Sequence, residues 1–412
     1  MPEFDTVIRS TRVVVPEGIR AADVVVREGR IEAVLPYRSR SDEGAPATDG
    51  GPPPPVVDLV DRALLPGAVD LGTGVHVPGR DLGECYRSAA AEALRGGVTC
   101  LVVSPAPARP AITCADSLQV HQSAAAGVPV HVAFLGGVTP GTSPLDLADL
   151  QAGGAVAFQT SLSDGGAPDM AALGDARLRK AMAEITTLDS LLMVHAEDAS
   201  ELGTPAVSAG RRPPRAERRG LERVIAAARV VGTRTHVGPF TAAECAALLS
   251  AAGAAGVELG AHTCPHYLCL PEDLPGPGSP VHACRPPLRS DANRKALWSA
   301  LLEEGSSIRT VGSGHLPAIG LRTLEWSLSA LWTAARRRGL SLDDLARWTA
   351  RGPADLLRLN RGRIAPGFEA DLVAFDDGAV TPVPSTDPGP YAGMDLVGRV
   401  ERVWVGGRSA QT

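Results

Sequence analysis

Between residues 64 and 360, short apolar segments alternate regularly with segments rich in alanine, leucine and arginine. The apolar segments, such as "VTCLVVSP" and "LLMVHAED", are typical of buried β-strands, and those between them, such as "TAAECAALLSAAGAAG", are typical of helices. Six or seven such β-then-α units follow a first strand at 68–76, which is close to the count of a (β/α)₈ barrel. An open doubly wound sheet is the alternative, but no glycine-rich phosphate loop opens the first helix.

The two ends of the chain differ from this central part. Valine and isoleucine recur at alternate positions in "ADVVVREGRIEAVLP" and "GRVERVWVGGR", and glycine-containing turns interrupt them. We therefore predict an α/β protein in which residues 1–63 and 361–412 pair into one small β-sandwich. A (β/α)₈ barrel of the TIM type, residues 64–360, is inserted between these two terminal parts.

Bulk properties exclude several classes of protein. The net charge is −6 with both signs spread along the chain, which argues against a nucleic-acid-binding surface. No window approaches the length of uninterrupted apolar sequence that a membrane span needs. Seven scattered cysteines, no C-x-x-C motif and no signal peptide lead us to expect reduced thiols and a cytoplasmic location.

Eight motifs, in order, resemble those of the cyclic amidohydrolases of the amidohydrolase superfamily, and those of allantoinase more than those of dihydroorotase or hydantoinase. The motifs occupy residues 66–80, 96–113, 194–198, 212–217, 263–268, 285–289, 313–317 and 362–376. The resemblance covers nearly the whole chain. It implies the barrel fold, hydrolysis of a cyclic amide C–N bond, and two divalent metals, typically zinc, at the carboxyl-terminal mouth of the barrel.

The resemblance also implies six metal-ligand positions: an H-x-H pair, a carboxylated lysine, two further histidines and an aspartate. Only His195 carries the implied residue. The other positions hold Gly72, Gly74, Gln159, Pro239 (or, with a shift of one residue, Gly238) and Gly314.

These replacements change the chemistry that the mouth can perform. Glycine and proline side chains donate no electron pairs to a metal, and a glutamine amide is a poor bridging ligand. The only lysines, Lys180 and Lys295, lie in helix-like segments rather than at strand ends. We therefore predict that no metal cofactor is bound, and hence that neither an activated hydroxide nor a Lewis acid is available. The aspartate lost at Gly314 would have been the general base.

Several polar residues remain near the predicted mouth. The candidate pocket comprises His76, Gln159, His195, His266, Arg285 and His315. The resemblance implies that His76 and Arg285 replace substrate-holding residues. For His195 we favour a buried structural imidazole, and for Glu197 and Asp198 a polar strand end and a helix cap. A metal site rebuilt from the histidines is disfavoured because no carboxylate or spacing supports it.

The sequence is compatible with two functions. The first is a homologue without standard hydrolase activity that acts as a scaffold, a binding protein, or a subunit of a homo-oligomer or of a complex with a partner enzyme. The second is a metal-independent enzyme that opens or closes the ring of a cyclic amide or ureide by histidine acid–base chemistry. The sequence indicates neither a nucleic-acid partner nor a membrane partner.

Overall fold

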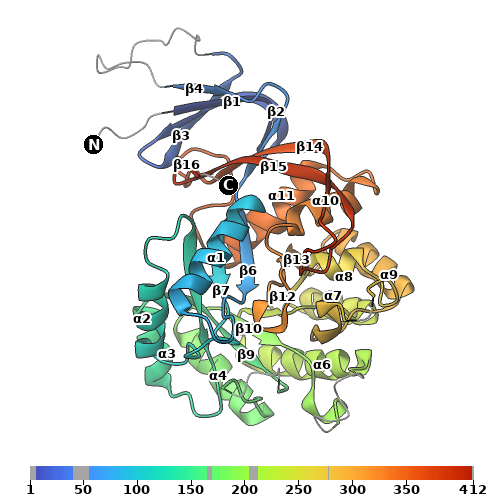
Figure 1. The fold of residues 1–412 in the computed structure, drawn as a ribbon. Helices are drawn as coiled ribbons and strands as arrows, with labels where there is room; N and C mark the ends of the chain where they lie inside the picture. The colour runs from blue at the N-terminus through green and yellow to red at the C-terminus, as the bar shows by residue number, and fades with distance from the viewer. Residues whose placement is uncertain (1–5, 40–54, 165–168, 204–211, 277, 411–412) are drawn as a thin grey trace.

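A computed structural model describes residues 6–39, 55–164, 169–203, 212–276 and 278–410. The chain forms a large barrel of strands and helices, with a separate sheet built from both ends of the chain above it (Figure 1). None of the described helices is long and apolar enough to span a lipid bilayer.

The central part is a barrel of eight parallel strands that neighbour one another in chain order from β6 to β13. These strands are β6 (Ala68–Thr73), β7 (Val98–Val103), β8 (His131–Gly137), β9 (Ala155–Ser161), β10 (Leu192–His195), β11 (Thr235–Val237), β12 (Leu259–Thr263) and β13 (Ile308–Val311). The predicted (β/α)₈ barrel is thus confirmed, and the doubly wound alternative is wrong.

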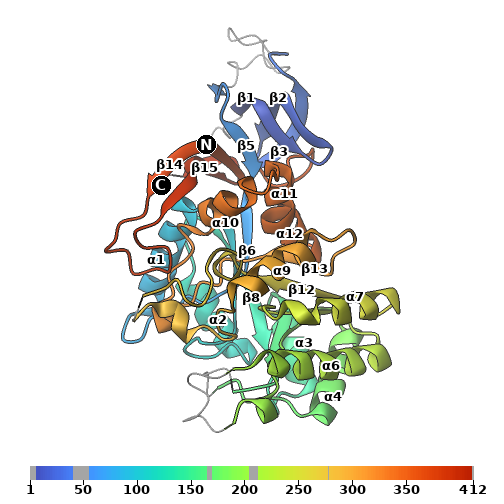
Figure 2. The same ribbon diagram turned by 90° about the vertical axis from the view of Figure 1, so that its right-hand side faces the viewer.

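Helices cover the outside of the barrel (Figure 2). They are α1 (Leu82–Arg95), α2 (Ala115–Ala124), α3 (Pro144–Ala152), α4 (Asp175–Thr187), α6 (Pro214–Val231), α7 (Ala246–Ala254), α8 (Pro265–Cys269), α9 (Asp291–Leu302), α10 (Ser327–Arg336), α11 (Leu342–Ala346) and α12 (Gly352–Leu356). Both lysines of the chain lie in helices, in α4 and α9, as the sequence predicted.

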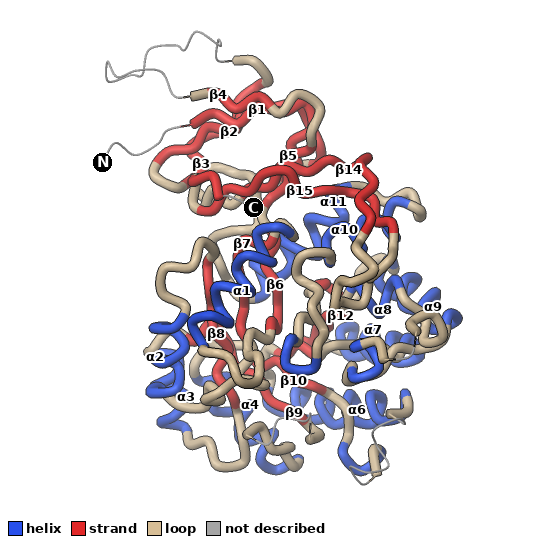
Figure 3. Tube along the Cα trace, in the orientation of Figure 1, coloured by secondary structure: helices blue, strands red, loops and turns tan. Residues whose placement is uncertain are grey.

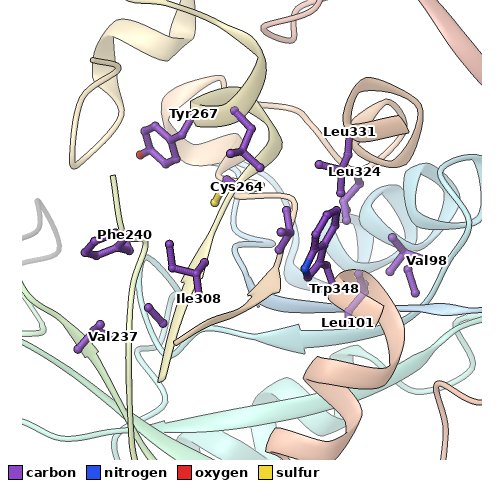
Figure 4. Close-up of a cluster of buried hydrophobic side chains, with 14 of the residues drawn as sticks. Val98, Leu101, Val237, Phe240, Cys264, Tyr267, Ile308, Leu324, Leu331 and Trp348 are labelled. Atoms are coloured by element: carbon purple, nitrogen blue, oxygen red, sulfur yellow. The ribbon is translucent and has the colours of Figure 1, made fainter. Parts of the chain in front are cut away.

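The barrel strands are apolar on both faces because both faces are buried. Outward side chains pack under the helices in one continuous core, part of which Figure 4 shows around Val237, Ile308 and Trp348. Inward side chains, including Leu71, Val102 and Met193, fill the barrel interior below the mouth.

The terminal sheet joins the two ends of the chain, as predicted (Figure 3). Its strands are β1 (Thr6–Val15), β2 (Gly18–Arg27), β3 (Arg30–Pro36), β4 (Val56–Asp58), β5 (Ala63–Pro66), β14 (Leu372–Pro382), β15 (Asp395–Val405) and β16 (Arg408–Ala410). Strand β5 pairs with both β1 and β14 and runs to Pro66, past the boundary expected at residue 63.

A buried carboxylate connects this sheet to the barrel. Asp371, directly before β14, is 1% exposed and lies 3.1 Å from both the Arg361 guanidinium and the imidazole of His131 on β8. Its backbone carbonyl accepts the N–H of Gly67 in the link between β5 and β6. These contacts fix how the sheet sits on the amino-terminal end of the barrel.

Candidate functional site at the barrel mouth

The carboxyl ends of the barrel strands and the loops that follow them carry the residues that the sequence placed at the mouth. The loop after β6 meets the loop after β13, where the Gly74 N–H donates to the His315 carbonyl at 2.7 Å. Gln159 lies near the end of β9 and His195 is the last residue of β10. His266 lies in α8, directly after β12.

Asp70 connects β6, the first strand of the barrel, to the segment that follows β13, the last strand. The buried Asp70 carboxylate accepts the Ser313 hydroxyl at 2.7 Å and the Thr73 hydroxyl at 2.6 Å, and it also accepts the Ser313 backbone N–H. Burial raises the pKa of Asp70, although these hydrogen bonds oppose the shift. The acid that precedes the implied H-x-H positions therefore links β6 to the segment after β13.

His195, Glu197 and Arg212 form a hydrogen-bonded group of side chains, named the His195 relay below. The Nε2 atom of His195 lies 2.9 Å from a Glu197 carboxylate oxygen, and Arg212 donates to the same carboxylate at 2.6 and 3.0 Å. Burial raises the pKa of Glu197, but the hydrogen bonds and charges of His195 and Arg212 outweigh this and lower it to about 2. A carboxylate only accepts, so Nε2 carries the ring proton and Nδ1 of a neutral His195 carries the lone pair.

Sequence reasoning named no partner for His195 and treated Glu197 only as a polar strand end. The two-residue spacing of His195 and Glu197 indicates such a pair, because it puts both side chains on the same side of an extended segment. Asp198 is a helix cap, as expected, because its carboxylate accepts the Ser200 N–H at 2.9 Å.

A second buried acid, Glu217 of α6, is bound by four donors. It accepts the hydroxyl and N–H of Thr241, the N–H of Ala242 and the Arg289 guanidinium at distances from 2.5 to 3.1 Å. Arg289 also donates to the Arg212 carbonyl at 2.6 Å, which links this acid to the His195 relay. Sequence reasoning noted the motifs that contain Arg212, Glu217 and Arg289 but gave these residues no role.

Three further imidazoles near the mouth, those of His262, His266 and His315, are buried and neutral. Burial lowers the pKa of His262 to about 4, that of His266 to about 3 and that of His315 to about 3. The Nδ1 atom of His315 accepts the Thr323 N–H at 3.1 Å, so it carries no proton. His262 stacks on His236 of β11 with ring centroids 5.7 Å apart.

This burial predicts a loss of stability in mild acid. The folded-state pKa of His266 lies below the ordinary value. The neutral imidazole therefore contributes fully to the free energy of unfolding above about pH 6.5, and this contribution decreases as the pH falls toward 3. The slope for one such group is about 1.4 kcal/mol per pH unit. We expect the Tm of the wild-type chain to fall between pH 7 and pH 5, and that of His266→Gln to fall less steeply.

The exposed His282 gives the matched control, since His282→Gln should keep the wild-type pH dependence. Parallel Tm curves for the wild type and the His266 variant would contradict the burial argument.

The other candidate residues are less constrained. His76 lies on the loop after β6, and burial together with the charge of Arg109 lowers its pKa. The Gln159 side-chain oxygen is buried and accepts no hydrogen bond from the described residues. Arg285 is exposed, and its neighbour Pro286 lines a small cavity beside Glu197 and Gly238.

The described side chains do not fit the two-metal centre that the resemblance implied. Among them, no group of three or more histidine, cysteine, aspartate or glutamate side chains is placed to hold a metal ion. The carboxylates of Glu197 and Glu217 accept hydrogen bonds from buried arginines. The Asp70 carboxylate accepts hydrogen bonds from Ser313 and Thr73. Within the described parts of the chain, the side chains at this mouth therefore do not form the donor set that structural and catalytic metal sites use.

Comparison with known proteins agrees with this architecture. The model of the amidohydrolase family matches residues 58–410. The chain is 35% identical to the allantoinase of Streptomyces avermitilis, covering 99% of this chain and 95% of that protein. It is 30% identical to the mitochondrial allantoinase of Aquarana catesbeiana, covering 86% and 76%.

Among solved structures, L-hydantoinase (dihydropyrimidinase) from Arthrobacter aurescens superposes with a TM-score of 0.86 at 24% identity, covering 98% of this chain and 96% of that one. The dihydropyrimidinase of Brevibacillus agri gives 0.83 at 24% identity, covering 98% and 94%. These likenesses show the shared fold.

The chain therefore belongs to the amidohydrolase family. Within that family it is an allantoinase-like cyclic amidohydrolase homologue, as the sequence motifs predicted.

Proposed function

We propose that this chain is an allantoinase-like protein that lacks the binuclear metal centre and does not catalyse standard cyclic-amide hydrolysis. It acts instead as a non-catalytic protein that binds a cyclic ureide or amide, or as a subunit of a homo-oligomer or of a complex with a partner enzyme. The observation that carries the proposal is the donor set at the mouth, where five of the six implied ligand positions hold glycine, glutamine or proline.

The electrostatics of the mouth support the same function. Hydrolysis of an amide requires a proton carrier for the leaving nitrogen, and an efficient carrier has a pKa near the working pH. The pKa values of His262, His266 and His315 lie well below this range. The carboxylates Asp70, Glu197 and Glu217 are already bound by donors of the protein itself.

One observation favours a second candidate, a metal-independent enzyme. Glu197 orients His195 through Nε2, which leaves Nδ1 as a possible proton acceptor. Such an oriented imidazole could remove a proton from a ureide nitrogen during ring closure. Arg212 donates to the same carboxylate, so Glu197 is shared between the imidazole and a guanidinium.

A combined binding and turnover assay separates the two candidates. Thermal shift with hydantoins, dihydropyrimidines and allantoin identifies binding, and chromatography of the same mixtures detects ring-opened or ring-closed product. We expect a raised Tm for one class without product. Product that disappears in His195→Asn would contradict the proposal and support the second candidate.

The location and partners are part of the same proposal. All seven cysteines are free thiols, which is consistent with a cytoplasmic protein. Size-exclusion chromatography with light scattering of the full chain tests the homo-oligomer.

A further inference from the structure

Two of the implied ligand positions, Gly74 and Gly314, and Gly238 beside a third are covered by side chains from neighbouring elements. At Gly314, a Cβ atom would lie 2.6 Å from the His266 ring and 2.9 Å from the Cys264 sulfur. The residue also adopts a φ of +68°, which disfavours any L side chain. The place of the lost aspartate is therefore occupied by α8.

At Gly238, next to the lost histidine position, the obstacle is another imidazole. A Cβ atom there would lie 2.2 Å from Nδ1 of His262 and 2.3 Å from its Cε1 atom. Burial is the main cause of the lowered pKa of His262, and nearby His195 adds to it. The His262 ring thus fills the space that a side chain at Gly238 would enter.

At Gly74, the second position of the lost H-x-H pair, an aliphatic chain lies close. A Cβ atom would lie 2.9 Å from a Leu316 methyl group and 3.1 Å from the His315 carbonyl. Gly72 gives the internal contrast, because a Cβ atom there would meet only the Ser104 hydroxyl, at 3.5 Å. If side chains had only been lost, with no repacking, we would expect open space at Gly74, Gly238 and Gly314 like that beside Gly72.

We propose that the volume of the former metal centre has been refilled, so that the glycines at 74, 238 and 314 are now packing requirements set by Leu316, His262 and His266. This inference deepens the proposed function and rests on it, because refilling makes the loss of the ligands part of the folded core. Contacts closer than van der Waals distance in a dense interior force neighbours to move. A larger side chain introduced at one of these three glycines would therefore collide with Leu316, His262 or His266.

A double-mutant cycle on Gly238 and His262 tests the inference. Gly238 has no positive φ, and the three atoms nearest to a Cβ placed there all belong to the His262 imidazole. We expect Gly238→Ala to lower the Tm by about 1–4 °C, the range that overpacking a buried site gives in a chain of this length. In the His262→Ala background the same substitution should change the Tm by less than about 0.5 °C.

Gly141 is the matched control, because a Cβ atom there meets nothing within 4 Å and Gly141→Ala should leave the Tm unchanged. Equal Tm losses from Gly238→Ala in both backgrounds, or no loss in either, would overturn the inference. This outcome is distinct from failure of the proposed function, which would appear as metal bound to the wild-type chain whatever the cycle shows.

Discussion

Replacing Glu217 with alanine is expected to lower the free energy of unfolding by about 3–5 kcal/mol, the range for removing one partner of a buried ion pair. The substitution leaves the Arg289 guanidinium, which is 10% exposed, without its carboxylate. It also leaves the Thr241 and Ala242 N–H groups without their acceptor. Chemical denaturation followed by circular dichroism measures the loss.

The same helix supplies the control. Glu222 of α6 is 51% exposed and pairs with Arg218 four residues earlier, so Glu222→Ala should change stability by less than about 0.5 kcal/mol. A Glu217→Ala variant as stable as Glu222→Ala would show that the mouth does not depend on this buried charge network.

A loss of similar size is expected in the terminal sheet when Asp23 is replaced with alanine. The Arg9 and Asp23 side chains are 1% and 0% exposed, and the guanidinium lies 2.9 Å from the carboxylate. Removing the acid leaves a buried cation without this partner, which should lower the free energy of unfolding by about 3–5 kcal/mol. Limited proteolysis locates the defect, because cleavage should begin in the terminal sheet before the barrel.

Two comparisons make this prediction specific. The pair formed by Arg27 and Glu32 is 41% and 45% exposed, so Glu32→Ala should remain within about 0.5 kcal/mol of the wild type. The double variant Arg9→Met with Asp23→Leu should recover most of the stability, since an apolar pair replaces both charges. A double variant as unstable as Asp23→Ala would mean that the ion pair acts through more than charge burial.

The fold could be predicted because its signals are local and repeated. Strand segments such as "VTCLVVSP" are mostly apolar, and every residue of Val98–Val103 is buried, as expected where both faces of a parallel sheet are covered. The period-two segments at both ends predicted a sheet joining the termini, although they could not place the end of β5 at Pro66.

The candidate site could be predicted only in part, because its contacts join distant segments. The motifs located His195, but its connection through Glu197 and Arg212 to Arg289 depends on how three loops meet. The sequence marked Pro239 (or, with a shift of one residue, Gly238) and Gly314 as lost ligands, and the structure places Gly238 and Gly314 against imidazoles. That imidazoles from β12 and α8 pack against them follows only from the three-dimensional arrangement.

Quantifying metal in the purified full chain tests the central claim most directly. Protein produced with zinc, manganese and iron in the medium, and never exposed to chelators, would be analysed by inductively coupled plasma mass spectrometry. A mouth in which five of the six implied ligand positions hold glycine, glutamine or proline predicts less than about 0.1 equivalent of any of these metals per chain. About two equivalents, retained through gel filtration, would contradict it.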